Sequence, residues 1–231
     1  MKAYFPRTPR FIMRFFSKYT WRFSMAKKEI FLTFDDGPTP EITKFVLSEL
    51  KKYNAKATFF CIGKNIKKHP EIFDEVISEC HSVGNHTQNH LNGWKTEKGE
   101  YLENVLKCET NLQGFKNLVG LNKNETKNTY KVLETLQEKP KLFRPPYGKI
   151  KKSQAKEVLK KGYKIIMWDV LSADFDTSIS KEKCLENVLQ NTKNGSIIVF
   201  HDSVKAAERM KYALPIVLKE FSEKGFVFKA I

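Results

Sequence analysis

The stretch FLTFDDGPTP, residues 31–40, joins an apolar run to two adjacent carboxylates and a Gly-Pro turn. The run at 30–34 is typical of a buried strand, and Asp35 and Asp36 follow it directly. Two like charges side by side at the end of a buried strand repel each other, so a cation, a proton or an arginine must relieve the repulsion. The stretch therefore predicts a buried strand that ends in a reactive site.

Short apolar runs alternate with longer amphipathic stretches over most of the chain. We expect strands at 30–34, 57–62, 163–168, 196–200 and 226–228. We expect helices near 41–53, 70–80, 97–113, 151–161, 181–193 and 205–223. Gly162, Gly195 and Gly225 each close a helical stretch just before an apolar run, where glycine supplies a left-handed cap. This alternation indicates the α/β class, with a parallel sheet that is either open or closed into a barrel.

The 231 residues carry a formal net charge of +15, and they are enough for one large domain or two small ones. Such a charge attracts anionic surfaces and polymers but does not determine the fold. The lysines are spread along the chain and are not interleaved with aromatics on one element, which argues against a nucleic-acid-binding protein. The four cysteines form no C-x-x-C pair, so free thiols in a reducing compartment are favoured over a disulfide framework.

Residues 1–27 form a basic and aromatic segment ahead of a single domain, residues 28–231. The segment does not resemble a secretory signal, because arginines interrupt its short apolar runs, and no stretch of the chain is apolar for long enough to span a bilayer. We therefore expect a location in the cytoplasm or at the inner membrane face, with export by an unrecognised route as the alternative. Residues 114–139, rich in Asn, Lys, Thr and Glu, are interpreted as an insertion or mobile loop.

Two interpretations of the N-terminal segment stay open. On a helix that begins near Pro9, basic residues three or four apart would form one stripe, namely Arg7, Arg10, Arg14, Lys18 and Arg22. Phe11, Phe15 and Tyr19 would share another face. The favoured interpretation is a terminal helix that docks on the core through these aromatics. The alternative is an amphipathic segment, residues 7–23, that lies on an anionic membrane.

Polar clusters follow five of the apolar runs, at the point where each run ends. The clusters are Asp35-Asp36 after 31–34, His86 and His90 after 82–85, Arg144 after 141–143, Asp174 after 165–168, and His201-Asp202 after 197–200. In a parallel α/β barrel the carboxyl ends of the strands share one rim, and active sites are built there. Five such placements favour one shared site over coincidence.

The stretch HTQNH, residues 86–90, places His86 and His90 four apart, so that on a helical turn both rings face the same way. Two imidazoles and one carboxylate make a three-ligand site of the kind found around catalytic zinc. One carboxylate of the Asp35-Asp36 pair can bind the cation, while the other accepts a proton from a water molecule. Two surface histidines would be the simpler reading of this motif taken alone.

The stretch RPPYG, residues 144–148, offers a constrained backbone donor. The two prolines have no N–H, so the first free amide after Arg144 belongs to Tyr147, and such a fixed donor suits a developing oxyanion. Arg144 can pair with the free carboxylate. His201 is the natural general acid, and Asp174 could orient it and raise its pKa. The simpler alternatives are a rigid loop with a surface arginine and a partly buried structural histidine.

Taken together, these stretches resemble the sequence motifs of a known enzyme family. They occur in the order and rough spacing of the polysaccharide deacetylases, which are carbohydrate esterase family 4 with a nodulation-factor-deacetylase-like domain. The resemblance covers roughly residues 28–230. The matching motifs are TFDDGP at 33–38, HTQNH at 86–90, RPPYG at 144–148, WDVLSADF at 168–175 and IIVFHD at 197–202.

The resemblance implies a distorted, incomplete (β/α) barrel of parallel strands that holds one divalent cation, most often Zn²⁺, with Co²⁺, Ni²⁺ or Mn²⁺ as alternatives. The metal ligands that it implies are Asp36, His86 and His90. The catalytic residues that it implies are Asp35 as base, Arg144 tuning Asp35, the Tyr147 amide at the oxyanion, and Asp174 tuning the proton donor His201. The residues that would contact the substrate are Trp168, Val199 and Pro146.

The implied reaction is hydrolysis of an N-acetyl, less often O-acetyl, group from an amino-sugar glycan such as peptidoglycan or a chitin-like polymer. The chain departs from the family pattern in the fourth motif, where Leu171 replaces an aspartate and Phe175 a tryptophan. A catalytically weak sugar-binding relic of the same fold is therefore the alternative function. Cys80 stands where glycine is common, and His81 after it is interpreted as structural.

Overall fold

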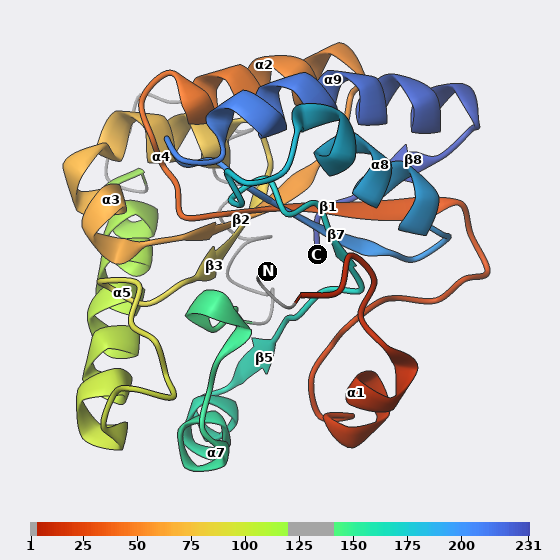
Figure 1. Ribbon diagram of the computed structural model, residues 1–231. Coiled ribbons are helices and arrows are strands. Elements are labelled where there is room, and N and C mark those ends of the chain that lie inside the picture. The colour runs from red at the N-terminus through yellow and green to blue at the C-terminus, as the bar shows by residue number, and fades with distance from the viewer. Residues whose placement is uncertain (1–3, 120–140) are drawn as a thin grey trace.

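A computed structural model of the chain describes residues 4–119 and 141–231 (Figure 1). The strands are β1 (Glu29–Asp35), β2 (Ala57–Cys61), β3 (Ser82–Asn85), β4 (Lys141–Phe143), β5 (Tyr163–Ile165), β6 (Val170–Leu171), β7 (Ile197–His201) and β8 (Val227–Phe228). The helices are α1 (Arg10–Phe15), α2 (Ile42–Lys52), α3 (Gly63–Lys68), α4 (Pro70–Ser78), α5 (Lys98–Val119), α7 (Lys152–Lys160), α8 (Lys181–Asn191) and α9 (Ala207–Glu223), with a 3-10 turn η1 (Pro146–Gly148). Most expected elements therefore exist, with ends shifted by a few residues.

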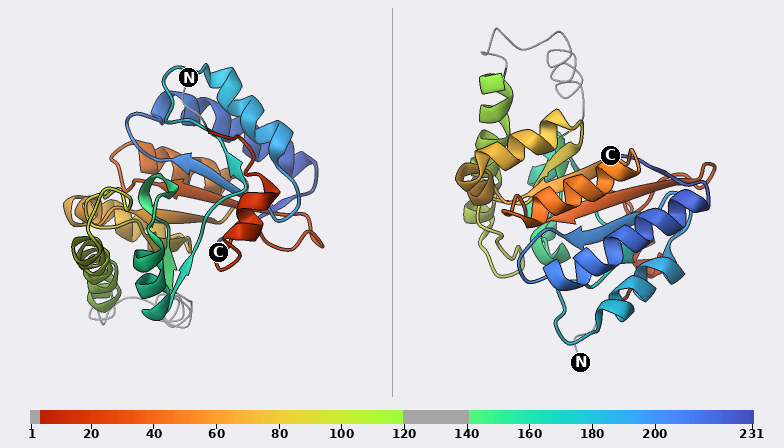
Figure 2. Two further views of the ribbon diagram at one scale, coloured as in Figure 1. Left: turned by 60° about the horizontal axis from the view of Figure 1, so that its bottom comes forward. Right: turned by 90° about the horizontal axis from the view of Figure 1, so that it is seen from above.

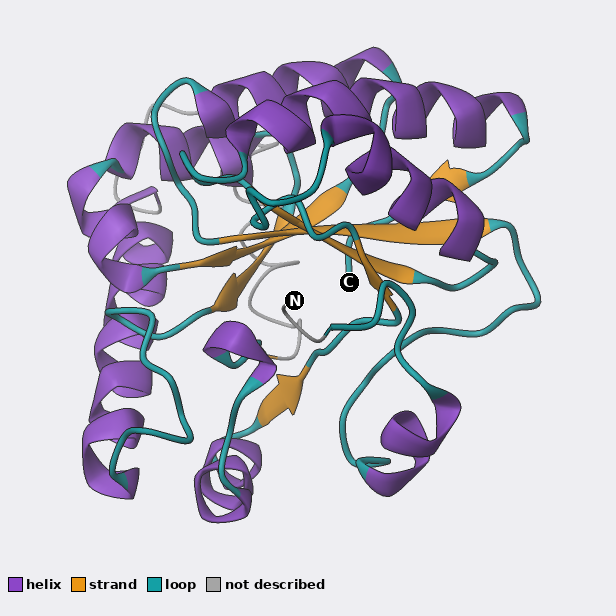
Figure 3. Ribbon diagram, in the orientation of Figure 1, coloured by secondary structure: helices purple, strands orange, loops and turns teal. Residues whose placement is uncertain are grey.

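All pairs of neighbouring strands in the sheet are parallel. The strand order is β5-β4-β3-β2-β1-β7-β6, and β8 pairs beside the start of β1. Figure 3 shows the strands curling through the middle of the molecule with helices around the outside. Figure 2 shows α2 and α9, which contact each other, side by side along the sheet. The expected distorted, incomplete barrel of parallel strands is confirmed.

Strand β1 is central and buried, which explains why its sequence is an unbroken apolar run rather than an alternating one. Its Phe34 ring lies between Phe59 of β2 and Phe200 of β7, with centroid distances of 5.2 and 6.1 Å. All three rings are fully or almost fully buried. Burial of a phenylalanine side chain contributes roughly 1.5–3 kcal/mol. This row of rings therefore holds β1, β2 and β7 together, and β1 and β7 end at Asp35 and His201.

The glycine turns predicted from the sequence are confirmed. Gly162, Gly195 and Gly225 have φ values of 82°, 76° and 76°, in the left-handed region that glycine enters without strain. At Gly195 space is also limiting, because a Cβ atom there would lie 2.4 Å from the carbonyl oxygen of Phe23. This close approach ties the N-terminal part of the chain to the start of β7.

Residues 4–23, called here the N-terminal strap, run along the edge of the sheet between β5 and β6. Backbone N–H groups of Leu171, Met167 and Phe23 donate to Pro6 O, Thr20 O and Gly195 O at 2.8, 2.7 and 2.8 Å. The strand expected over 163–168 consequently ends at Ile165, because the residues after it pair with the strap instead of with a strand.

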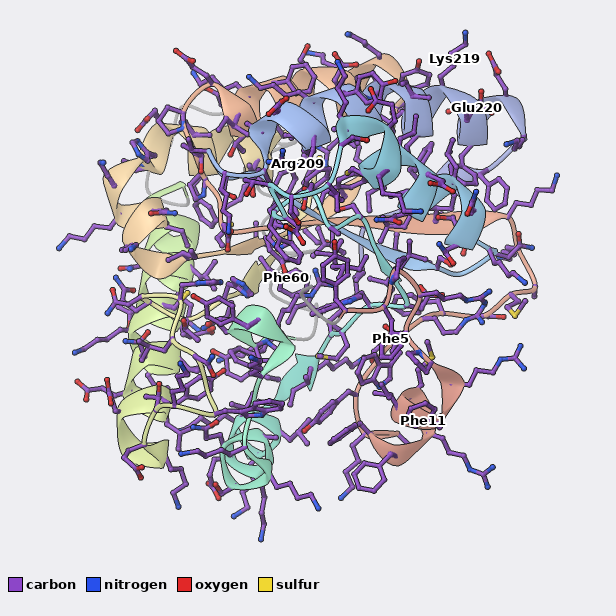
Figure 4. All side chains as sticks on the ribbon, viewed as in Figure 1. Phe5, Phe11, Phe60, Arg209, Lys219 and Glu220 are labelled. Carbon is purple, nitrogen blue, oxygen red and sulfur yellow. The ribbon has the colours of Figure 1, made fainter. Side chains whose placement is uncertain are left out.

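Helix α1 of the strap begins after Pro9, as expected, but it ends after 6 residues. The strap docks on the core, but of the three aromatics expected to do so only Tyr19 packs on a buried cluster. Ile12, Met13 and Phe16 pack on the buried cluster around Phe143 and Tyr163. The rings of Phe11 and Phe15 are 71% exposed, and Figure 4 shows Phe11 on α1 at the outer edge of the molecule, whereas Phe60 lies near its middle.

Three further expectations concern the rest of the chain. Helix α5 continues to Val119, so the first residues of segment 114–139 are helical, and residues 120–139 of it lie outside the described residues. The cysteines Cys61, Cys80, Cys108 and Cys184 are free thiols. Within residues 4–119 and 141–231, no helix is both long and apolar enough to cross a bilayer.

Candidate active site

A cavity of about 570 Å³ opens at the carboxyl ends of the parallel strands. The strand-end residues predicted from the sequence meet there, either on its wall or directly behind it. The lining residues are Tyr4, Asp35, Asp36, His86, His90, Tyr147, Gly148, Trp168, Leu171, Phe175, Val199, His201, Ser203, Val204 and Lys205. The five polar clusters therefore form one site, as a shared barrel rim requires.

Asp36, His86 and His90 bring one ligand atom each to within 4.8 Å of one another. Asp36 Oδ1 lies 3.2 Å from His90 Nε2 and 3.8 Å from His86 Nε2. This carboxylate oxygen is buried and has no hydrogen-bond partner among the described residues. A buried carboxylate oxygen without a donor is costly, and a cation would satisfy it. The three residues therefore fit a metal ion of the kind that two imidazoles and a carboxylate hold.

The hydrogen bonds of the two imidazoles leave their Nε2 atoms free. His86 Nδ1 lies 2.7 Å from the carbonyl oxygen of Arg144, which can only accept, so Nδ1 carries the proton. His90 Nδ1 lies 3.1 Å from the Tyr147 hydroxyl. Burial, followed by the nearby His90, lowers the pKa of His86 to about 3, and burial also lowers the pKa of His90. Neutral rings with a free Nε2 lone pair are the form that binds metal.

Asp35 pairs with a fully buried arginine instead. Arg144 Nη1 donates to Asp35 Oδ1 at 2.7 Å, and it also lies 2.6 Å from the Thr33 hydroxyl. The Nε and Nη2 groups of Arg144 donate to the carbonyl oxygens of Ile166 and Met167 at 3.1 and 3.0 Å. With its donors held on three sides, the guanidinium fixes one oxygen of Asp35. The adjacent aspartates are thus separated, since one faces a cation site and the other an arginine.

The RPPYG loop presents Tyr147 at the mouth of the cavity, where its side chain is 60% exposed. Its φ of 60° is in the left-handed region, which turns the backbone sharply between Pro146 and Gly148. Pro146, expected to contact the substrate, is instead buried and does not line the cavity. Tyr147 and Gly148, which follow Pro146 through the turn, line the cavity in its place.

His201 and Asp174 form the pair expected from the sequence. Asp174 is fully buried and accepts from His201 twice, with 2.7 Å between Nδ1 and Oδ1 and 2.7 Å between the backbone N and Oδ2. Burial by itself lowers the pKa of His201, but the charge and hydrogen bond of Asp174, with the charges of Asp36 and Asp35, outweigh it and raise the pKa to about 9. His201 therefore carries a proton at neutral pH, as a general acid must.

The expected apolar wall is present. Trp168, Val199 and Leu171 line the cavity, and the Phe175 ring meets His201 edge-on at a centroid distance of 5.2 Å. The replacements in the fourth motif therefore keep an apolar wall. They also leave the His201–Asp174 pair intact, because the acid at 174 makes both contacts alone.

Two supporting residues were given no role from the sequence, although Asp202 was named in the last polar cluster. Buried Asp202 accepts from the Gly37 N–H at 2.9 Å and from the Thr43 hydroxyl at 2.6 Å. Asn65 Nδ2 donates to the backbone oxygen of Asp36 at 2.7 Å. Together they hold the turn that gives Asp36 its φ of 86°. Asp202 could have been suspected, because it follows His201 directly in the last motif, whereas nothing marks Asn65.

Positive backbone φ values recur around the cavity. Besides Asp36, His90 has a φ of 57° and Tyr147 one of 60°. Non-glycine residues enter this region at a cost of about 1–2 kcal/mol, and such strain concentrates where surrounding structure over-determines a functional geometry. The strained residues here are two of the three metal-ligand candidates and the loop residue that touches one of them.

A protein-family comparison matches residues 23–118 to the polysaccharide deacetylase family. Two relatives are peptidoglycan-N-acetylglucosamine deacetylases of Bacillus cereus. One is 36% identical over 188 residues, which are 80% of this chain and 61% of that protein. The other is 32% identical over 213 residues, which are 92% of this chain and 90% of that protein. The chain thus spans about three fifths of the first relative and nearly all of the second.

Solved structures agree with this assignment. A peptidoglycan N-acetylglucosamine deacetylase in complex with 4-naphthalen-1-yl-N-oxidanyl-benzamide is 31% identical, with a TM-score of 0.76 over 97% of this chain and 95% of that one. A neighbour described as a CE4 family pseudoenzyme from Bacillus anthracis, at 23% identity and a TM-score of 0.70 over 91% and 66% of the two chains, shows the fold alone. The chain belongs to the polysaccharide deacetylase family, the carbohydrate deacetylases of carbohydrate esterase family 4.

Proposed function

We propose that this chain hydrolyses the N-acetyl amide of an amino sugar in a glycan, and that N-acetylglucosamine of peptidoglycan or its precursor is the substrate. The relatives at 36% and 32% identity support the substrate class. One observation carries the proposal: the Asp36–His86–His90 group, the Asp35–Arg144 pair and the His201–Asp174 pair face one cavity. An amide hydrolase needs these three functions: an electrophile, a base and an acid.

Asp36, His86 and His90 would hold the divalent cation, for which we propose Zn²⁺ because neutral imidazoles and a carboxylate suit it. A dication there would act as a Lewis acid on the substrate carbonyl and acidify a water molecule. The oxygen of Asp35 that Arg144 does not hold would accept the proton of that water. This division of labour explains the two adjacent carboxylates of the DDGP stretch.

The remaining steps use this chain's own donors. The Tyr147 backbone N–H would donate to the oxygen that becomes negative when water attacks the carbonyl carbon. His201 would give its proton to the sugar nitrogen as the C–N bond breaks, so that acetate and a free amine leave. Asp174 would hold the His201 ring and keep it protonated until then. One water is consumed for each acetate released.

The complete His201–Asp174 pair favours catalysis over the sugar-binding relic. The deciding experiment measures acetate release from fully N-acetylated chito-oligosaccharides and peptidoglycan fragments, with and without a chelator. Wild type should release acetate, the chelator should abolish release, and zinc should restore it. Asp35→Asn is the matched control, because it removes the base and leaves the cation ligands Asp36, His86 and His90 unchanged. Stoichiometric metal with no acetate from any glycan in wild type would contradict the proposal.

We propose further that the enzyme works at the inner membrane face on a lipid-linked sugar precursor. A second cavity, of about 690 Å³, lies between the strap and α7 and supports this proposal. It is lined by aromatic and lysine side chains that suit anionic lipid, among them Phe15, Phe16, Tyr19, Lys18, Lys152 and Lys156. Phe15 is exposed at this cavity, and Phe11 is exposed on the same helix, α1.

Vesicle flotation tests the membrane contact with the full chain. Wild type should float with phosphatidylglycerol vesicles and much less with phosphatidylcholine vesicles. The double variant Phe11→Ser/Phe15→Ser should lose flotation, whereas Leu106→Ser, which changes an exposed leucine on α5, should not. Equal partitioning of wild type and the double variant would contradict the contact. Recovery of the native protein in the cell-wall fraction would show export instead.

A further inference from the structure

The N-terminal strap reaches into the cavity through Tyr4. The Tyr4 ring lines the cavity and packs edge-on against Phe175, with 5.8 Å between centroids and 64° between planes. Phe175 in turn meets His201 edge-on at 5.2 Å. Tyr4 is thus two ring contacts from the proton donor His201.

Hydrogen bonds hold Tyr4 in place in two ways, through the backbone that follows it and through its side-chain hydroxyl. Just after it, the Leu171 N–H donates to Pro6 O at 2.8 Å, and the Thr8 N–H donates to Asp169 O at 2.9 Å. The hydroxyl of Tyr4 bonds to Asp176, a buried carboxylate that also accepts from the Ser178 hydroxyl. Burial first, then this bond, raises the pKa of Tyr4 to about 12, so the ring stays neutral and fixed.

Tyr4 lies outside residues 23–118, the span that the family model matches. It nevertheless touches the place where the chain departs from the family pattern. The strap bonds to the backbone of Leu171 and packs on Phe175, which are the two replaced positions of the fourth motif. The strap therefore supplies part of the cavity wall beside the fourth motif.

We propose that Tyr4 forms a sugar-binding subsite on the acid side of the cavity and stacks on the pyranose ring next to the acetylated one. The inference rests on the proposed function and identifies a specificity-determining residue for it. A half-exposed aromatic ring offers the flat apolar surface on which the C–H face of a sugar packs. Phe175 contacts both His201 and Tyr4 edge-on, and Tyr4 is the ring farther along this row from the proton donor, so we expect it to meet a neighbouring sugar.

Measurements of glycan affinity test the sugar-binding role of Tyr4 separately from turnover. Calorimetry in an Asp35→Asn background measures the Kd of the fully N-acetylated chitotetraose and of the N-acetylglucosamine monomer. Adding Tyr4→Ala should weaken tetramer binding about three- to tenfold, as expected for loss of one aromatic contact, and should leave monomer binding within about twofold. Tyr4→Phe keeps the ring and should bind the tetramer within about twofold of the parent.

Phe5→Ala is the matched control, because Phe5 is the next aromatic of the strap, is 60% exposed and does not line the cavity (Figure 4). It should leave both affinities unchanged. Equal losses in Tyr4→Ala and Phe5→Ala, or an unchanged tetramer affinity in Tyr4→Ala, would overturn the subsite. Tyr4→Leu, which keeps apolar packing on Phe175, replaces Tyr4→Ala if that variant does not fold.

Two further results separate this inference from the proposed function. In the otherwise wild-type enzyme, Tyr4→Ala should raise KM for the tetramer by the same three- to tenfold factor, about the loss of one aromatic contact, with kcat within about twofold. A fall in kcat at unchanged KM would place Tyr4 in the chemistry and overturn the subsite alone. If wild type released no acetate and Asp35→Asn bound no glycan, the proposed function and the subsite would both be overturned.

Discussion

His86 and His201 line one cavity, His86 buried and His201 partly buried, yet their pKa values move in opposite directions. The pKa of His86 falls to about 3, and that of His201 rises to about 9. Burial favours the neutral ring in both cases, so the neighbours make the difference. His86 bonds to a backbone carbonyl and faces His90, whereas His201 bonds twice to the carboxylate of Asp174. Burial thus keeps His86 neutral, as a ligand must be, whereas the carboxylate of Asp174 overcomes burial at His201 and makes it an acid.

The two sides also differ in how the chain builds them. The metal side takes Asp36, His86 and His90 from two loops that directly follow β1 and β3. The acid side takes His201 from the end of β7 and Asp174 from the loop after β6, and Tyr4 comes from the far N-terminus. Short motifs at strand ends therefore supply both sides, and Tyr4 alone comes from a distant segment that packs against the acid side. Substitutions on each side should fail in different ways.

The largest contrast should come from two substitutions on the metal side. His86→Ala removes a ligand, so we expect loss of both bound zinc and acetate release. Asp35→Asn removes the base but no ligand, so turnover should fall about 10⁴-fold, the upper range for a general base, while zinc stays stoichiometric. Metal content by mass spectrometry and acetate release by a coupled assay measure the two effects. An Asp35→Asn variant that stayed active, or that lost its zinc, would contradict the separation of the two aspartates.

The acid side should lose rate without losing metal. His201→Ala should slow turnover about 10²–10³-fold, within the usual range for a missing general acid. Asp174→Asn removes the charge that raises the pKa of His201, so this pKa should fall below about 9. Since the protonated ring is lost as pH rises through its pKa, the alkaline limb of kcat/KM should move to lower pH. A limb that did not move in Asp174→Asn would show that another group sets it.

Much of the metal side could be predicted from the sequence, because each motif there is a short run at a strand end. TFDDGP and HTQNH place Asp36, His86 and His90 correctly at the rim once the strands are known to be parallel. The Asp35–Arg144 pair was predicted in the same way, since an isolated buried carboxylate needs a partner. The carbohydrate deacetylase class followed from these motifs, and family membership confirms it.

The strap could not be predicted, because its contacts join residues more than a hundred positions apart. Nothing local shows that Thr20 pairs with Ile166 or that Tyr4 enters the cavity. The same long-range pairing shortened β5 and turned Phe11 to solvent. Helical periodicity says which residues share a face, but it does not say which face the rest of the chain will cover.

A third histidine, outside the cavity, tests whether burial alone can lower a histidine pKa in this protein. His81 accepts from the Ala57 N–H at 3.2 Å, and burial, aided by the charge of Lys56, lowers its pKa to about 4. In the unfolded chain the ring binds a proton below about 6.5. Between pH 6.5 and 4 the unfolded state therefore binds more protons than the folded state. The free energy of unfolding should then decrease by up to about 3 kcal/mol as the pH is lowered through this range.

Urea unfolding at pH 7 and pH 4.5 measures this loss, and His81→Asn should reduce it, since the amide can still accept from Ala57 but does not titrate. Acetate release at pH 7 by His81→Asn should match wild type, because His81 lies at the opposite end of β3 from His86. An unchanged loss of stability on acidification would show that His81 titrates normally. Burial would then not suffice to explain the low pKa of His86.

The smallest effect concerns backbone strain. Cys80 has a φ of 61°, close to the 60° of Tyr147, but it caps α4 on the protein surface, where the His81 N–H donates to Val76 O at 3.2 Å. Glycine suits this left-handed cap, so Cys80→Gly should stabilise the fold by about 0.5–1 kcal/mol in urea unfolding, with acetate release unchanged. Cys80→Ala keeps the strain and should not stabilise. Equal gains in both variants would show that removal of the thiol, and not relief of backbone strain, stabilises the fold. The positive φ of Cys80 would then cost no measurable free energy, and the similar φ of Tyr147 could not be called strained on this ground.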